Sequence, residues 1–192
     1  DAIRAESPSG NRSALLLTAL YHDAIYDPRS HNNEEDSAQL WLSHAAQPDA
    51  PLGRLVAETI RATVWKSPPA SEVARRFFQL DTHPLDDGCP LAERVRYEQA
   101  IFREFQWVPF ASYREKRAEF LRRWSTTYPS HAAGAAQCLD LLGSLTPRIA
   151  LYPGSFNPFH LGHLSILRQA EKAFDKIILA VGINRQKPGA GE

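Results

Sequence analysis

Two histidines in the segment LYPGSFNPFHLGHLSIL, residues 151–167, have a spacing that suits phosphate chemistry. His160 and His163 are three positions apart, so they share one face if the chain is helical there. A helix start attracts anions because its first amides have no partner inside the helix. Imidazoles held at that point could stabilise the charge that grows on a phosphate in a transition state, an effect worth about 3 kcal/mol for comparable donors.

The elements that must position these histidines follow from the apolar pattern on either side. Residues 148–152 (RIALY) and 176–183 (KIILAVGI) are short β-prone runs, and residues 161–174 have helical periodicity. Strand, helix and strand form a βαβ unit, which predicts parallel strands joined by a right-handed crossover. Ligands of such units bind at the carboxyl end of the first strand. The turn at residues 152–159 occupies that place.

Residues 13 to about 145 have a different character, with apolar residues at helical spacing throughout. Turns rich in Pro, Gly and Asp separate the helical segments, and Thr146–Pro147 forms a short linker. The sequence therefore predicts an all-α domain at residues 1–145. A partial α/β, Rossmann-like βαβ domain follows at residues 148–192.

Composition narrows the classes of partner. The 22 basic and 22 acidic side chains balance, so no overall field favours nucleic acid or an anionic membrane. No apolar run is long enough to span a bilayer. Cys89 and Cys138 lie far apart without metal-ligand spacing, which predicts reduced thiols in a cytoplasmic protein. Four histidines lie in polar or loop contexts and are predicted to be at the surface: His31, His44, His83 and His131.

A second group of chemically capable residues lies near the start of the chain. His22 and Asp23 end an apolar helical segment, and further acidic residues follow at Asp27, Glu34 and Glu35. Imidazole and carboxylates together can bind a divalent metal that activates water for phosphoester hydrolysis. The alternative is a helical bundle in which the His–Asp pair is satisfied and does no chemistry.

The C-terminal motif carries a family resemblance. H-L-G-H after G-S-F-N-P resembles the H-x-G-H signature of the nucleotidyltransferase superfamily, and residues 148–187 look most like the start of phosphopantetheine adenylyltransferases. The resemblance implies nucleotide transfer from ATP, carried with Mg²⁺, to a phosphorylated small molecule, with release of pyrophosphate. It assigns Ser155 to the substrate phosphate, His163 to the transition state and Lys187 to the reacting phosphates.

The remaining motif positions leave the acceptor open. His160, the first motif position, is a Thr in many phosphopantetheine enzymes, and FNPFHLGHL is closer to nicotinate or nicotinamide mononucleotide adenylyltransferases. The resemblance also places Gly154, Phe156 and Gly162 beside the nucleotide. The later I-S-S-T-x-x-R-like segment of the family is not in this sequence, so residues 148–192 are expected to be the start of a larger domain.

The helical half has a resemblance of its own. Residues 13–128 are similar to predicted metal-dependent phosphohydrolases of the HD superfamily. This resemblance implies an HD-type helical domain with a divalent metal bound by His22, Asp23 and Asp81. The family uses a further histidine upstream, and no histidine precedes His22 in this sequence.

Three hypotheses follow. The leading one is adenylyl transfer from ATP to a phosphorylated small molecule, by a domain fused to the HD-type module. The second is metal-dependent phosphohydrolysis by the helical module. The third is a helical module that does no chemistry and supports or regulates the transferase. None requires nucleic acid or a membrane, and assembly into a homo-oligomer stays open.

Overall fold

The computed structural model describes residues 9–182. The helices of the first part are α1 (Ser9–Tyr21), α2 (Asn33–His44), α3 (Pro51–Ala62), α4 (Glu72–Asp81), η2 (His83–Leu85), α5 (Leu91–Glu104), α6 (Phe110–Thr127), η3 (Pro129–His131) and α7 (Ala132–Ser144). After them come β1 (Ile149–Gly154), α8 (Leu161–Ala170) and β2 (Lys176–Val181). The order confirms the predicted change from helices to a strand–helix–strand segment near residue 147.

The helices begin where local chemistry favours a helix start. Pro51 takes the first turn of α3, where its missing amide hydrogen costs nothing. The Ser71 side chain caps α4 by accepting a hydrogen bond from the Ala74 amide at 3.0 Å. Val56 and Ile60, four residues apart on α3, are both fully buried. Burial at this spacing is what the periodicity in the sequence predicts.

The helices form two packed groups. Helix α1 contacts α2, α3 and α4, while α7 packs against both α5 and α6. A cluster of aromatic side chains joins α4 to α6 and η3. Its ring centroids lie 4.5–6.2 Å apart, and its members are Phe78, Trp124, Tyr128 and His131. The predicted surface position of His131 is therefore wrong: its ring lies buried among these aromatic side chains.

The C-terminal unit has the predicted topology. Strands β1 and β2 pair in parallel, in a register that runs from Ile149 opposite Lys176 to Gly154 opposite Val181. Helix α8 forms the crossover and begins at Leu161, directly after His160. Both the parallel pairing and the helix start are confirmed.

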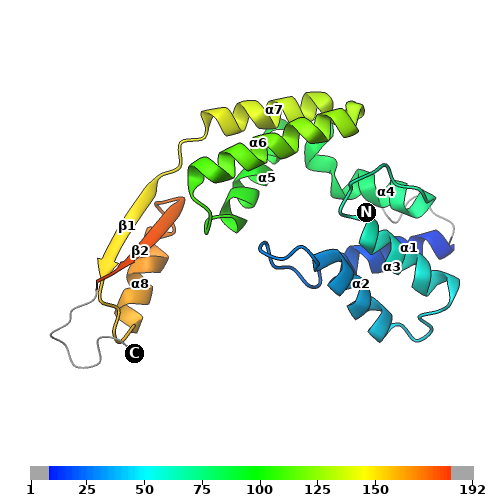
Figure 1. Cartoon of the computed structure of the whole chain (residues 1–192), viewed down its shortest axis with the longest axis horizontal. Coiled ribbons are helices and arrows are strands. Elements are labelled where there is room, and N and C mark those ends of the chain that lie inside the picture. Colours follow the sequence, from blue (N-terminus) through cyan, green and yellow to red (C-terminus); the bar gives the residue numbers. More distant parts are fainter. Residues whose placement is uncertain (1–8, 183–192) are drawn as a thin grey trace.

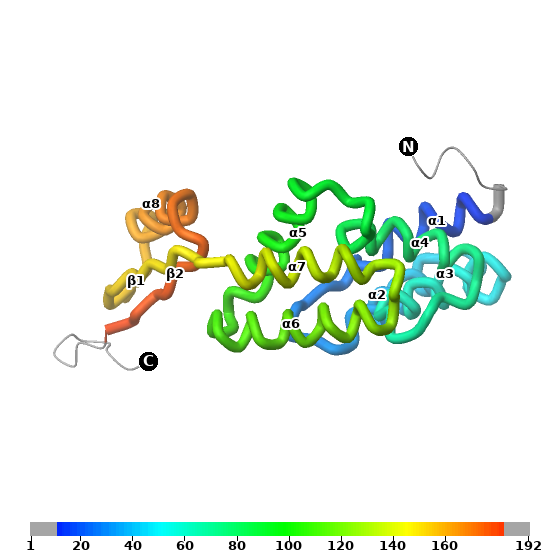
Figure 2. The backbone as a smooth tube through the Cα atoms, turned by 90° about the horizontal axis from the view of Figure 1, so that it is seen from above, coloured from blue at the N-terminus to red at the C-terminus, as the bar shows by residue number. Residues whose placement is uncertain are grey.

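The molecule is elongated, with the βαβ unit at one end and α1 to α4 at the other (Figure 1). Viewed from above, α5, α6 and α7 lie between them, and α7 leads into β1 along the long axis (Figure 2). The turn between α5 and α6 contacts the βαβ unit. There, the Lys176 ammonium donates to the Val108 carbonyl at 2.8 Å, and the Gln106 amide donates to the Asp175 carbonyl. Among the described residues, no helix is both long and apolar enough to cross a membrane.

Candidate functional site

The turn between β1 and α8 has an unusual backbone. Phe156 has a φ of 49°, a left-handed conformation that residues with a side chain rarely adopt. This conformation folds the Phe156 ring back over the end of β1, where a Cβ on Gly154 would lie 2.9 Å from the ring. A side chain at position 154 would therefore force this ring to move.

Two hydrogen bonds fix the histidines at the start of α8. The His160 Nδ1 accepts from the Gly162 amide at 3.1 Å, and the His160 amide donates to the His163 Nδ1 at 3.3 Å. Each side chain thus caps the helix with its Nδ1 atom. A neutral imidazole that accepts at Nδ1 carries its proton on Nε2. Both rings therefore keep an Nε2–H as a donor for a ligand.

The two imidazoles are stacked. Their centroids are 3.7 Å apart and their planes are inclined by 25°. The Phe156 and Phe159 rings lie 5.2 and 5.4 Å from the His163 ring. The pKa of His163 is lowered, first by desolvation and second by the neighbouring His160 imidazole. The arrangement places two Nε2–H donors beside a helix N-terminus, where they can hydrogen-bond to a phosphate.

The other residues predicted for this site are placed around the same turn. Ser155 is exposed next to Gly154, and within the described residues its hydroxyl has no hydrogen-bond partner. Gly162 is the second residue of α8 and donates to His160. Lys187 lies outside the described residues. Phe159 was not predicted, and its apolar character between Pro158 and His160 was the available signal.

A second cluster forms around His22, just after the end of α1. The His22 Nε2 lies 3.2 Å from an oxygen of Asp23 and 3.7 Å from Oδ1 of Asp81. The structure therefore brings together the three residues that the sequence proposed as metal ligands. Partial burial opposes protonation of His22, but Asp23 and Asp81 outweigh it and raise the pKa of His22.

Asp81 has a partner that the sequence did not reveal. The Trp65 indole donates to Oδ2 of Asp81 at 2.6 Å, which leaves Oδ1 facing His22. Desolvation raises the pKa of Asp81, while the Trp65 hydrogen bond and the His22 imidazole act in the opposite direction. Sixteen positions separate Trp65 from Asp81, and no local pattern links them. One nitrogen and two carboxylate oxygens form a donor set suited to a divalent transition metal.

The comparisons with known proteins concern the βαβ unit. Residues 151–189 match the family described as Cytidylyltransferase-like. Over 42 residues the chain is 57% identical to a phosphopantetheine adenylyltransferase of Neisseria meningitidis serogroup C, which covers 22% of this chain and 25% of that protein. The enzyme of the same name from Mycoplasma capricolum is 58% identical over 40 residues, 21% of this chain and 29% of that protein.

The chain is thus similar to nucleotidyltransferases over a short stretch. The family match spans the positions of His160 and His163. The chain spans between a quarter and a third of the length of these relatives. The family match at residues 151–189 does not reach the helical part. No solved structure matches the chain significantly.

Proposed function

We propose that the β1–α8 turn is part of a site for nucleotidyl transfer from ATP to a phosphorylated small molecule. The observation that carries the proposal is the paired Nε2–H donors of His160 and His163, which stand at the carboxyl end of a parallel strand. This segment is also the one that is similar to phosphopantetheine adenylyltransferases.

Each residue then has a role that follows from its position. His160 and His163 donate to oxygens of the phosphate that is attacked, and this interaction strengthens as negative charge grows there. Gly154 and Phe156 shape the turn, Gly162 holds His160, and the Ser155 hydroxyl is free to contact a substrate phosphate. Lys187 is proposed to contact the reacting phosphates. Mg²⁺, bound to ATP when it arrives, would neutralise part of the triphosphate charge.

The test is pyrophosphate release by the chain in the presence of ATP. Phosphopantetheine and nicotinate mononucleotide are supplied separately as acceptors, and each substrate is omitted in turn. We expect release that requires both ATP and one of the acceptors, which would also identify the acceptor. Release that is absent with both acceptors, or that continues without an acceptor, would contradict the proposal.

A second candidate function rests on the convergence of His22, Asp23 and Asp81. We propose that these residues hold a divalent metal that supports phosphoester hydrolysis by an HD-type module. Water on such an ion is acidified and becomes a nucleophile near neutral pH. The competing interpretation is a helical part that does no chemistry and supports or regulates the transferase.

Binding of Mn²⁺ separates these interpretations, because only the first of them needs a metal ion at this cluster. Mn²⁺ is a suitable probe since it prefers carboxylate oxygens to sulfur ligands. Mn²⁺ binding by the chain is measured by electron paramagnetic resonance, with Asp23→Ala as the variant and Asp140→Ala, an acidic residue on α7, as the control. Binding that is lost only in Asp23→Ala supports the metal site. Equal and negligible binding in all three proteins supports the role without chemistry.

A further inference from the structure

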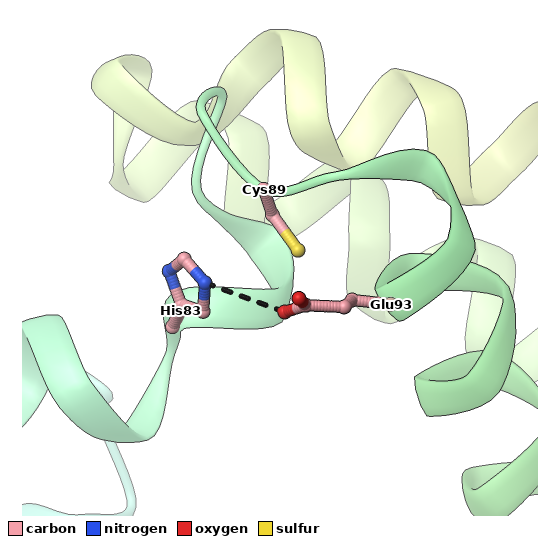
Figure 3. Close-up of side chains that lie close together, drawn as sticks. All are labelled: His83, Cys89 and Glu93. Carbon is pink, nitrogen blue, oxygen red and sulfur yellow. Dashed lines mark ion pairs between the residues drawn. The ribbon is translucent and has the colours of Figure 1, made fainter.

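Three potential ligands of a metal ion converge between η2 and α5 (Figure 3). His83 is the first residue of η2, Cys89 precedes α5, and Glu93 lies in the first turn of α5. One ligand atom from each residue can be chosen so that all three lie within 4.8 Å of one another. In the part of the chain that the structure describes, no other group of three His, Cys, Asp or Glu side chains meets that condition. The ligand atoms around His22 therefore lie farther apart than these.

The three side chains lie close together but do not form hydrogen bonds with one another. His83 Nε2 and Glu93 Oε2 are 3.7 Å apart, which is too long for a hydrogen bond. Within the described residues, the Cys89 thiol makes a weak contact with the Pro90 carbonyl at 3.7 Å. The sulfur points towards the Glu93 carboxylate, which the His83 imidazole also faces (Figure 3). A small ion would complete the bonding of all three groups.

The separation of 3.7 Å between His83 Nε2 and Glu93 Oε2 suits zinc. Zinc binds nitrogen and oxygen at about 2.0–2.2 Å and sulfur at about 2.3 Å, so ligand atoms of a tetrahedral site lie roughly 3.3–3.8 Å apart. Thiolate and imidazole select Zn²⁺ over Mg²⁺ or Ca²⁺, which prefer oxygen. A thiolate, a carboxylate and a neutral imidazole also balance the charge of Zn²⁺.

The backbone around Cys89 is held in place by hydrogen bonds from the buried Arg94 side chain. The Arg94 side chain is fully buried, and its Nη2 donates to the carbonyls of Asp86 at 2.8 Å and Cys89 at 3.1 Å. The Cys89 amide donates in turn to the Asp86 carbonyl at 3.0 Å. The loop is therefore fixed in position whether or not an ion is bound.

Two further hydrogen bonds hold the same loop, one of them from helix α7. The Gly134 amide donates to Oδ1 of Asp87 at 2.9 Å, and the Asp86 amide donates to the His83 carbonyl at 3.0 Å. Binding to a loop that is already ordered avoids the entropy cost of arranging the ligands.

Access to the group is open on one side. The side chains of His83 and Glu93 are 49% and 47% exposed, whereas Cys89 is 5% exposed. An ion can therefore enter from solvent and reach a thiol at the base of the site.

We propose that His83, Cys89 and Glu93 form a zinc site with a fourth position open to water or another ligand. This site shares no ligand with the cluster of His22, Asp23 and Asp81. It is also independent of the proposed transferase site, since it uses none of the β1–α8 residues.

Co²⁺ tests the site because a cobalt–thiolate bond gives a charge-transfer absorption in the near ultraviolet. The whole chain is first titrated with Co²⁺ as the only metal. Zn²⁺ is then added to the cobalt-loaded chain and should displace the cobalt. We expect one Co²⁺ per chain with the thiolate absorption. The absorption should disappear in Cys89→Ser, and Co²⁺ affinity should fall at least tenfold in His83→Ala and in Glu93→Gln.

Matched controls are His31→Ala and Glu115→Gln, which change exposed residues of the same types and should retain the signal. His83→Ala and Glu93→Gln alter half-exposed side chains, so these variants should fold even if Cys89→Ser does not, as circular dichroism would show. Zn²⁺ should also raise the thermal midpoint of the wild-type chain by more than that of these variants. No thiolate absorption in the wild type, or an absorption unchanged in His83→Ala and Glu93→Gln, would overturn the proposal.

Discussion

Arg117 and Glu98 form an ion pair between α5 and α6 that water barely reaches. The side chains are 9% and 8% exposed, and two hydrogen bonds of 2.7 and 3.2 Å join the guanidinium to the carboxylate. The Arg117 guanidinium also lies 4.9 Å from the centroid of the Phe120 ring. Each charge is tolerated in this position because the other one compensates it.

Removing one partner should therefore be costly. Arg117→Met leaves the Glu98 carboxylate buried without its partner, and we expect a loss of about 3–5 kcal/mol in the free energy of unfolding. The double variant Arg117→Met with Glu98→Leu should regain part of that loss. Urea denaturation measures both, and a cost below about 1 kcal/mol for the single variant would contradict this account.

The pair between Arg61 and Glu35 provides the control. Its two hydrogen bonds are as short, 2.7 and 2.9 Å, but its side chains are 37% and 50% exposed. Arg61→Met should cost no more than about 1 kcal/mol, because solvent screens exposed pairs.

At the scale of single residues, the sequence predicted side chains whose partners are close along the chain. It mostly missed side chains whose neighbours in space are far away in the sequence. His160 and His163 were found because their spacing and the helix start between them are visible in one short segment. The burial of His131 depends on Phe78, far away in the sequence, and on Trp124 from another helix. Cys89 is an exception, because its neighbours in space, His83 and Glu93, also lie within six positions of it in the sequence. A comparison of Cys89 with Cys138 alone misses this local group.

Among the elements, α7 shows how a single glycine sets a packing distance. A Cβ on Gly134 would overlap the Leu85 carbonyl oxygen and the Nη1 atom of Arg94. Neither neighbour can move easily, because one is backbone and the other belongs to a fully buried side chain. Gly143, on the same helix, has nothing within 4 Å of the corresponding position.

The two glycines should therefore respond in opposite ways to the same substitution. Gly134→Ala should lower the free energy of unfolding by about 1–3 kcal/mol through overpacking. Gly143→Ala should be neutral or stabilising by up to about 1 kcal/mol, because alanine favours a helix. Thermal and urea unfolding compare the two, and equal effects would show that α7 does not approach Leu85 as closely as described.

The elements were largely predictable because their signals are local. Strands β1 and β2 and helix α8 follow from the apolar periodicity, and their parallel order follows from the general handedness of βαβ units. The packing of α7 on both α5 and α6 could not be predicted, since periodicity shows that a face is buried but not which helix covers it. The hydrogen bond between Trp65 and Asp81 could not be predicted either, because periodicity does not show which side chains meet in the interior.

On the scale of the whole molecule, the helical part and the βαβ unit differ in how much apolar surface they bury. The core residues of the helical part come from α1 to α7. Helix α8 has no buried residue, and Leu161 is 81% exposed. The described unit presents its histidines beside this open apolar surface. The sequence predicted its topology, while its position at the end of α7 depends on contacts of Gln106 and Lys176 that have no signature in sequence.

The central claim is that the donor pair at the start of α8 stabilises charge on a phosphate. His163→Ala removes the Nε2–H donor but also the helix-capping Nδ1, whereas His163→Asn can keep an acceptor near the Nδ1 position. Turnover and nucleotide affinity are measured for both variants by pyrophosphate release from ATP. Thermal unfolding is followed in parallel, and His31→Ala at an exposed position is the control.

We predict that turnover falls by about a hundredfold or more in both variants, as it does when a preorganised donor is removed elsewhere. Nucleotide affinity should fall much less, because ground-state binding does not depend on that donor to the same degree. The thermal midpoint should change little. A loss of folding in both variants, or unchanged turnover in a folded variant, would contradict the claim and make the histidines structural.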